Sequence, residues 1–459
     1  MGAFKWQGEY PYMEIIAPMN YAFVRWLVVI VILIANTPGA YADQPDNEIW
    51  PVTVAKNGFS LSQCDAILAD FAPIKLALGE NQALYTYLNM AQFFPHQQVS
   101  RTGEVKSLVK KLRPKLGKVR VVTELGNLSF QEVIAHPKSR VQGIIVLHQG
   151  NIVFESYPGM RASDSHLWWS LAKVITGLIV EQLIHENKLD PTQKIAHYVP
   201  EFSASVWAEI SVQNILDMAS GIDAVDTAKD YIDPTSGIGR LISAEGILAS
   251  TAGQTAIGHN QALKLMHSHA EPGLRYEYSS ANTNILALLI EALSNKRYAD
   301  VVQERVWSKI GAEADALLGL SPDGRAIAHG MFASRLRDLG RFGLLYTPAG
   351  GDEATLPGAV LNKITDLKSN QHYQNAPEAA ENALSKLGER PVNALSQWDA
   401  LFSDGDLFKS GFDGQALYVS PSRDVVIAMF STSKNKSAYA YLRAIARQFP
   451  LNAARPKSG

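Results

Sequence analysis

Ser170 and Lys173 stand three residues apart in the segment HLWWSLAKVITGLIVEQL, residues 166–183. A serine hydroxyl becomes a good nucleophile when a base takes its proton, and a lysine can be that base if burial lowers its pKa. On a helix this spacing puts both side chains on one face. The pair could therefore attack a carbonyl carbon. The structural alternative is that Ser170 caps the helix while the Lys173 ammonium reaches solvent.

Ser-x-x-Lys is a weak motif by itself, because it occurs four times in this chain. The pair at Ser170 is singled out because it opens a long apolar helix, whose N-terminus offers free backbone N–H groups and a positive field. Trp168 and Trp169 beside it could supply the burial that a lysine base needs. The other pairs lie in a basic stretch or a Ser/Lys-rich turn and begin at Ser107, Ser431 and Ser433.

Two further motifs follow in the chain. Tyr278-Ser279-Ser280 lies between a Pro-Gly turn and a predicted helix, where the Tyr278 hydroxyl could pass a proton to a leaving group. Lys409-Ser410-Gly411 precedes a predicted strand, and glycine there lets the backbone approach a ligand and offer an N–H to an oxyanion. Taken alone, Tyr278 also fits a packed structural tyrosine, and Lys-Ser-Gly is a common tripeptide.

In this order and spacing the three motifs resemble those of the serine β-lactamase and penicillin-binding-protein superfamily. The likeness runs from about Leu84 to the end of the chain and is greatest to the class C-type branch, in particular to the 6-aminohexanoate-dimer hydrolases. The flanking segments GIIVLHQGNIVFESY, ILDMASGID, RLRDLGRFGLLY and GFDGQALYVSPSRDVVI also carry it.

The resemblance implies a role for each motif residue. Ser170 would be the acylated nucleophile, Lys173 its base and Tyr278 the proton shuttle. The backbone N–H groups of Ser170 and Phe412 would form the oxyanion hole. Substrate-binding positions implied in the same way are Trp169, Tyr231 on a loop that closes over the substrate, Ser280 beside the lysine, and Lys409. This chain has Lys-Ser-Gly where the lactamases have Lys-Thr-Gly, and it lacks the Ser-Asp-Asn triplet of class A enzymes.

An α/β fold has to position these residues. Apolar runs at Ile144–Leu147 and Ile152–Phe154 flank His-Gln-Gly-Asn, which predicts a hairpin with Gly150 in its turn. A second hairpin is predicted to turn at Pro421–Asp424. Because hairpins pair strands antiparallel, we expect a β-lactamase-like antiparallel sheet flanked by helices, with an inserted mostly helical domain.

The predicted organisation has four parts. Residues 1–42 are a signal peptide, and residues 43–135 are an N-terminal helical and loop segment packing on the catalytic domain. Residues 136–205 and 320–459 together form the α/β catalytic domain. Residues 206–319 are the inserted mostly helical domain.

The N-terminal segment shows the three-part pattern of a secretory signal. Arg25 precedes the apolar run Trp26–Ala35, Pro38 follows, and cleavage is expected after Ala42. The run is shorter than the roughly 20 residues a spanning helix needs, so no stable membrane span is expected after cleavage. The protein is therefore predicted to be periplasmic or secreted, with an uncleaved anchor as the alternative.

The overall composition is that of a globular protein, with 47% hydrophobic residues and a net charge of -2. No nucleic-acid partner is expected; the most basic stretch, Lys106–Lys118, has the amphipathic spacing of a solvated helix face. The single cysteine, Cys64, excludes an intrachain disulfide and lies on a predicted helical apolar stripe. Scattered histidines and the absence of metal or phosphate motifs predict neither a metal nor a cofactor.

Together these observations predict an exported serine hydrolase that cleaves a small-molecule amide or ester through an acyl-enzyme. The substrate class is open among amidase, carboxylesterase, D-amino-acid peptidase and β-lactamase activity on the same site. A non-catalytic penicillin-binding-like module is the further alternative, and the oligomeric state is left open.

Overall fold

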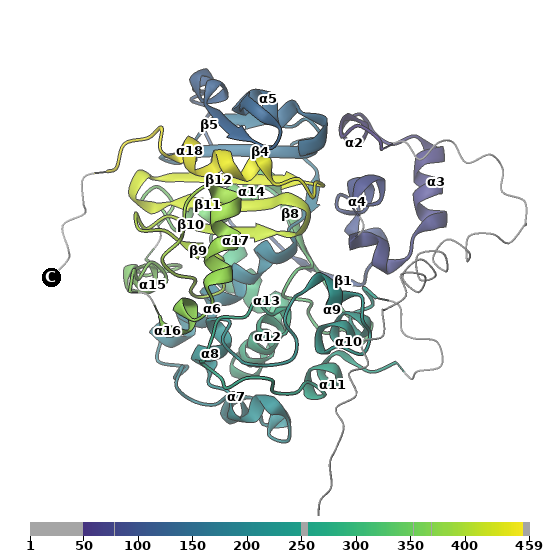
Figure 1. The fold of residues 1–459 in the computed structure, drawn as a ribbon, viewed down its shortest axis with the longest axis vertical. Coiled ribbons are helices and arrows are strands. Elements are labelled where there is room, and N and C mark those ends of the chain that lie inside the picture. The colour runs from purple at the N-terminus through teal and green to yellow at the C-terminus, as the bar shows by residue number, and fades with distance from the viewer. Residues whose placement is uncertain (1–48, 78, 249–255, 352, 369, 453–459) are drawn as a thin grey trace, which may run out of the picture. The chain divides into compact units, whose positions relative to one another are not determined.

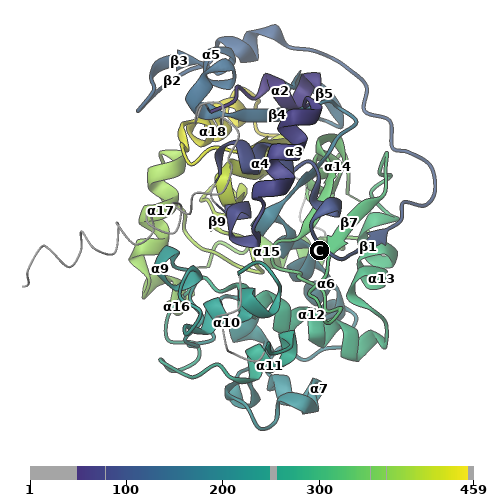
Figure 2. The same ribbon diagram turned by 90° about the vertical axis from the view of Figure 1, so that its right-hand side faces the viewer.

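A six-stranded antiparallel sheet carries the elements around the predicted nucleophile (Figures 1 and 2). The computed structural model describes residues 49–452 apart from 78, 249–255, 352 and 369, so the predicted signal peptide lies outside the described residues. The strand order is β5-β4-β12-β11-β10-β9. The strands are β4 (Val141–His148), β5 (Asn151–Ser156), β9 (Ala400–Leu401), β10 (Leu407–Gly411), β11 (Gln415–Ser420) and β12 (Val425–Ser431).

Side chains of β12 alternate between two hydrophobic cores, as the period of two along a strand requires. Val425, Ile427 and Met429 share a core with α18 (Ala440–Ala446) and α5 (Phe130–Ala135). Val426, Ala428 and Phe430 face the other core, which includes α14 (Leu336–Leu344). Gly343 of α14 allows this close packing, because a Cβ there would lie 2.5 Å from Val426 Cγ1.

Both predicted hairpins are present. β4 pairs antiparallel with β5 through a turn in which Gly150 has a φ of 71°, a left-handed conformation that favours glycine. β11 pairs antiparallel with β12 across a turn at Pro421–Arg423. The expected fold class, an antiparallel sheet with helices on its faces, is confirmed.

A second, four-stranded sheet has the order β1-β7-β8-β6 and leads directly to the nucleophile. Its strands are β1 (His96–Val99), β6 (Ser165–Leu167), β7 (Ala316–Gly319) and β8 (Phe332–Arg335). The helices between β6 and β7 are α6 (Lys173–His185), α7 (Ile195–Tyr198), α8 (Val212–Leu216), α9 (Ala228–Tyr231), α10 (Gly237–Ala244), α11 (His259–Lys264), α12 (Ser280–Ser294) and α13 (Tyr298–Val302).

The remaining elements lie at the start of the described chain and between α14 and β9. They are α2 (Thr53–Asn57), α3 (Leu61–Asp70), α4 (Glu80–Thr86), the hairpin β2 (Arg120–Thr123) and β3 (Gly126–Ser129), α15 (Gly358–Ile364), α16 (Gln371–Gln374) and α17 (Pro377–Leu387). Cys64 lies on α3, half-buried. The predicted domain boundaries at 135/136, 205/206 and 319/320 stay a prediction. Among the described residues, no helix has both the length and the hydropathy to cross a membrane.

The predicted amphipathic helix over Lys106–Lys118 is wrong. The first half of this stretch is extended along the edge strand β5, where Lys111 N–H donates to the Ile152 carbonyl at 2.8 Å and Ile152 N–H donates to Val109 at 2.9 Å. A 3-10 turn, Pro114–Lys118, follows. The open backbone groups of an edge strand outweigh the helical spacing of the side chains, because they offer the segment sheet hydrogen bonds.

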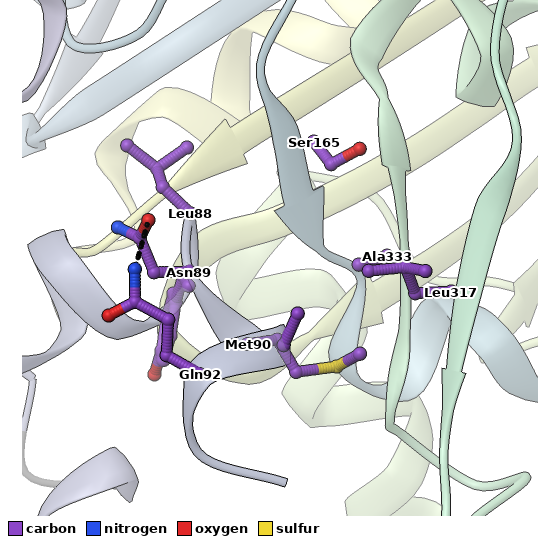
Figure 3. Close-up of a pocket in the computed structure, with 9 residues that line it drawn as sticks. Leu88, Asn89, Met90, Gln92, Ser165, Leu317 and Ala333 are labelled. Carbon is purple, nitrogen blue, oxygen red and sulfur yellow. Dashed lines mark hydrogen bonds between the residues drawn. The ribbon is translucent and has the colours of Figure 1, made fainter. Parts of the chain in front are cut away.

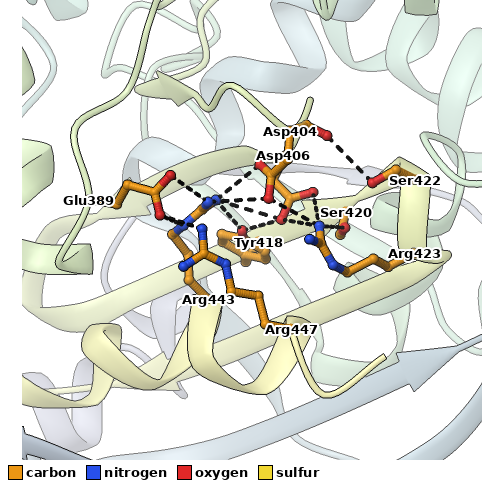
Figure 4. A network of polar contacts seen from close by, with 9 residues as sticks. All are labelled: Glu389, Asp404, Asp406, Tyr418, Ser420, Ser422, Arg423, Arg443 and Arg447. Atoms are coloured by element: carbon orange, nitrogen blue, oxygen red, sulfur yellow. Dashed lines mark hydrogen bonds and ion pairs between the residues drawn. The ribbon is translucent and has the colours of Figure 1, made fainter. Parts of the chain in front are cut away.

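A network of buried and half-buried charged side chains connects α18 to β11 and to the segment before β10 (Figure 4). The Arg443 guanidinium, with a side chain 3% exposed, lies 3.0 Å from Glu389 and 3.2 Å from Asp404, and it donates to the Tyr418 hydroxyl at 2.8 Å. Arg423 adds ion pairs to Asp404 and Asp406. Arg447 at the edge of the network is half exposed.

A small cavity of about 150 Å³ lies between residues 87–92 and strands β6, β7 and β8 of the second sheet (Figure 3). Its lining includes Met90, Ser165, Leu317 and Ala333, with Tyr87 at one side. None of Ser170, Lys173 and Tyr278 lines it.

Candidate active site

Ser170 lies in a single 3-10 turn, Trp169–Ala172, between β6 and α6. Strand β6 fixes the entry to this turn, since Trp168 N–H donates to the Phe332 carbonyl of β8 at 2.7 Å. The N-cap of α6 is Ala172, and that of the 3-10 turn is Trp168. Ser170 is therefore not a helix cap, and the structural alternative for its hydroxyl is wrong.

Lys173, the first residue of α6, points into the protein and has no exposed surface. Its ammonium nitrogen Nζ donates to three oxygens: Ser170 Oγ at 3.3 Å, Ser280 Oγ at 3.0 Å and the His329 carbonyl at 2.9 Å. Burial lowers the pKa of Lys173 to about 7; the carboxylate of Asp226 opposes this shift and Lys409 adds to it. A large fraction of Lys173 is therefore uncharged at neutral pH, as a base must be.

Tyr278 lies two residues before α12 and faces both lysines. Lys173 Nζ lies 5.0 Å from the centre of its ring, and Lys409 Nζ donates to its hydroxyl at 3.1 Å. Burial and the nearby carboxylates of Asp399 and Asp226 raise the pKa of Tyr278 well above its usual value, while a hydrogen bond with Ser170 opposes the shift. Tyr278 is accordingly a neutral phenol that can give a proton and take one back.

The Asp226 carboxylate accepts hydrogen bonds from Ser280 and Tyr231, and Ser280 in turn contacts Lys173. Ser280 donates to this carboxylate twice, from its hydroxyl at 2.5 Å and from its backbone N–H at 2.8 Å. The Tyr231 hydroxyl donates to the same carboxylate at 3.2 Å and lies 3.3 Å from Ser280 Oγ. Tyr231, which the sequence predicted on a loop, is the last residue of helix α9, and it is thus linked to Lys173 through one serine hydroxyl.

Lys409 forms an ion pair with Asp399, which the sequence analysis did not identify. The Lys409 side chain is fully buried, and the Asp399 carboxylate also accepts from Ser410 N–H at 2.8 Å and Ser410 Oγ at 2.6 Å. Burial alone would raise the pKa of Asp399, but the Lys409 and Lys386 ammonium groups bring it below its usual value. These contacts make Lys409 a neighbour that orients Tyr278; its assignment to substrate binding stays a prediction.

The end of β10 passes close to the nucleophile turn. A Cβ on Gly411 would lie 2.6 Å from the Trp168 carbonyl oxygen, so glycine is required for this approach. The next residue, Phe412, has a side chain 44% exposed, and its ring lies 5.4 Å from that of Trp169. The backbone of Phe412 therefore follows the closest approach of β10 to the turn that holds Ser170, which is where the second oxyanion donor was predicted.

The predicted residues thus form two groups around Ser170. In one group, direct contacts join Lys173, Tyr278, Ser280, Tyr231 and Lys409, and in the other the rings of Phe412 and Trp169 pack together. Trp169 is 7% exposed, so most of its surface is covered by protein. Asp226 and Asp399 were missed because no local sequence pattern marks them. Only the structure shows that Asp226 accepts from the buried Ser280 hydroxyl and that Asp399 pairs with the buried Lys409 ammonium.

Comparison with known proteins identifies the family of this chain. The family model described as Beta-lactamase matches residues 130–449. The 6-aminohexanoate-dimer hydrolase of Paenarthrobacter ureafaciens is 27% identical over 289 residues, which cover 63% of this chain and 71% of that protein.

Two solved structures share the fold. A Bacillus anthracis protein provisionally assigned as a 6-aminohexanoate-dimer hydrolase superposes with a TM-score of 0.63 at 22% identity, covering 80% of this chain and 92% of its own. EstCE1, a hydrolase with promiscuous acyltransferase activity, superposes with a TM-score of 0.51 at 13% identity, covering 70% of this chain and 96% of its own.

Proposed function

Because the chain belongs to the beta-lactamase family, whose members are serine hydrolases, we propose that it cleaves a small amide or ester through an acyl-enzyme on Ser170. The observation that carries this proposal is the burial of Lys173, whose Nζ hydrogen-bonds to Ser170 Oγ at 3.3 Å under the ring of Tyr278. A fully buried amine beside a hydroxyl is the arrangement that general-base activation of serine needs.

Acylation begins with a proton transfer from Ser170 Oγ to the uncharged Lys173 Nζ as the new Oγ–C bond forms. The carbonyl oxygen becomes an oxyanion, which the backbone N–H groups of Ser170 and Phe412 stabilise. Tyr278 then gives its hydroxyl proton to the leaving amine or alkoxide as the C–N or C–O bond breaks, and it recovers a proton from the Lys173 ammonium.

Deacylation reverses these steps with water as the nucleophile. Water gives its proton to the Tyr278–Lys173 pair while its oxygen attacks the acyl carbon, and a second tetrahedral oxyanion uses the same two donors. Its collapse breaks the C–Oγ bond and returns the proton to Ser170. The products are a carboxylic acid and an amine or alcohol.

The first substrate to test is the 6-aminohexanoate dimer, because the 27% identical relative carries that activity in its name. The other members of the assay panel are nitrophenyl esters, D-Ala peptides and nitrocefin, which represent esterase, peptidase and β-lactamase activity. Each of them presents an acyl carbon to the same serine. The member with the highest kcat/KM assigns the substrate class.

The chemistry is tested by Ser170→Ala, Lys173→Ala and Tyr278→Phe, with Ser107→Ala as a matched control from another Ser-x-x-Lys pair. Each of the three site variants is expected to lose about 10²-fold or more in kcat, because the nucleophile and its proton-transfer groups act as a unit. A fluorophosphonate adduct on Ser170, located by mass spectrometry, is expected in the wild type and the control. If all three variants keep wild-type turnover, the proposal fails. If the wild-type protein shows neither an adduct nor turnover of any substrate in the panel, the protein is a non-catalytic module.

We further propose that the protein acts outside the cytoplasm, on the basis of the signal pattern ending at Ala42. N-terminal sequencing of protein from the secreted or periplasmic fraction is expected to begin at Asp43. Recovery of full-length protein in the cytoplasmic fraction would contradict export.

A further inference from the structure

Tyr87 belongs to the part of the chain that precedes the family match at residues 130–449. It follows α4 directly, and its side chain has no exposed surface. Its backbone carbonyl accepts a hydrogen bond from Leu167 N–H of β6 at 2.8 Å. The N-terminal segment is thus anchored at the strand that leads into the nucleophile turn.

The Tyr87 side chain contacts both sides of the proposed oxyanion hole. Its ring lies 5.6 Å from the ring of Trp169, the residue before Ser170, at an interplanar angle of 76°. Its hydroxyl donates to Asp413 Oδ2 at 2.9 Å, with the Leu76 carbonyl 3.1 Å away as a second acceptor. Asp413 is the residue after Phe412.

A contact between the two sides completes a ring. The side chains of Trp169 and Phe412 pack at 5.4 Å, so the contacts run from Tyr87 to Trp169, on to Phe412, along the chain to Asp413 and back to Tyr87. Edge-to-face aromatic pairs of this spacing are directional, so each ring restricts the orientation of the next.

The two residues that Tyr87 contacts beside the proposed donors have an unfavourable backbone conformation. Trp169 has a φ of 51° and Asp413 a φ of 56°, values that residues with a side chain rarely adopt. Such conformations persist where the surrounding structure holds them, and they set the direction of the neighbouring N–H groups. Those neighbours are Ser170 and Phe412, the two proposed oxyanion donors.

We propose that Tyr87 is a positioning residue that holds the backbone N–H groups of Ser170 and Phe412 at the spacing that a tetrahedral oxyanion requires. The inference rests on the proposed acyl-enzyme function and adds to it a contribution from outside the family match. The ring of Tyr87 fixes the turn at Trp169, and its hydroxyl fixes the turn at Asp413.

The test is Tyr87→Phe, which keeps the ring and removes the hydroxyl bond to Asp413. Tyr85→Phe is the matched control, because Tyr85 lies on α4 two residues before Tyr87 and its hydroxyl donates to Gln92 Oε1 at 2.9 Å. The readouts are kcat and KM on the best ester of the panel and the inhibition constant of a boronic acid that forms a tetrahedral adduct on serine.

We expect Tyr87→Phe to lower kcat about tenfold with KM changed less than about twofold, because the donors are displaced rather than removed. Boronic acid affinity should fall by about the same factor, since the adduct places an oxygen in the same hole. Tyr85→Phe should leave both constants unchanged. Asp413→Gly keeps the left-handed turn and removes the carboxylate that accepts from Tyr87. Because both substitutions break the same hydrogen bond, kcat of the double variant should be no lower than that of the slower single variant.

Wild-type kcat and boronic acid affinity in Tyr87→Phe would overturn the inference while leaving the acyl-enzyme intact. Equal losses of kcat in Tyr85→Phe and Tyr87→Phe would also overturn it, because a general effect on packing would explain them. The same holds if the kcat losses of Tyr87→Phe and Asp413→Gly add independently in the double variant. Failure of the wild-type protein to form the Ser170 fluorophosphonate adduct would overturn the proposed function and this inference together.

Discussion

Asp226→Asn is expected to extend activity to lower pH. Its carboxylate is linked to Lys173 by two hydrogen bonds in series, of 3.0 and 2.5 Å through Ser280 Oγ, which place Nζ within about 5.5 Å of the carboxylate oxygen. The Asp226 charge favours the ammonium form of Lys173 and raises its pKa against the larger effect of burial. Removing the charge therefore lowers the pKa of Lys173.

The size of the effect follows from Coulomb's law. At about 5.5 Å and an effective dielectric constant of roughly 20 to 40, the attraction between the two charges is about 1.5–3 kcal/mol. This energy changes the protonation equilibrium of Lys173 by roughly 10- to 100-fold. Because Lys173 in the wild type has a pKa of about 7, about 1% of it is uncharged at pH 5. The asparagine variant should raise this fraction by at least about tenfold.

The assay is kcat/KM on a nitrophenyl ester between pH 4.5 and 8. The wild-type rate should fall about tenfold per pH unit well below pH 7, whereas Asp226→Asn should keep its rate to lower pH. Asparagine can still accept from Ser280 N–H through Oδ1, and its Nδ2 can donate to the Ser280 hydroxyl, which keeps both contacts. Asp230→Asn is the matched control four residues further along the chain, in α9, where the carboxylate accepts from Thr227 Oγ1. An acidic limb that stays in place or moves to higher pH in Asp226→Asn would refute the reasoning.

Three further predictions concern the framework of the site. Lys409→Met removes the ion-pair partner of the mostly buried Asp399 carboxylate and should reduce the free energy of unfolding by about 3–5 kcal/mol, measured by urea denaturation. Gly411→Ala places a Cβ 2.6 Å from the Trp168 carbonyl oxygen, so the substitution should lower kcat about tenfold or more in the ester assay. Arg443→Met should cost about 3–5 kcal/mol, and half-exposed Arg447→Met less than about 1 kcal/mol, in thermal unfolding.

These three predictions have separate controls and contradictions. For Lys409→Met, the double variant with Asp399→Asn should recover most of the lost stability, and no recovery would contradict the assigned pairing. An alanine at Gly411 that keeps wild-type kcat would mean that β10 does not need its close approach. Equal losses for Arg443→Met and Arg447→Met would show that burial does not decide the strength of the network in Figure 4.

Local patterns predicted the elements that depend on neighbours in the chain. The hairpin at Gly150 follows from a turn residue between two β-branched runs, and the apolar helix after Ser170 follows from its unbroken hydrophobic sequence. The order of the three motifs was enough to predict the family. Lys106–Lys118 shows where this approach fails: its spacing is helical, but the free edge of β5 offers it backbone hydrogen bonds that no periodicity reveals.

The sequence alone therefore determined which residues are proposed to carry the chemistry, because Ser170, Lys173 and Tyr278 belong to motifs with a fixed order and spacing. Tertiary structure decided what surrounds them: Asp226 reaches Ser280 across 54 residues, Lys409 reaches Tyr278 across 131, and Tyr87 reaches Asp413 across 326. The physical reason is that the pKa of a lysine and the direction of a backbone N–H depend on burial and on charges nearby in space. Only the packing of distant segments brings those charges together and removes the water between them.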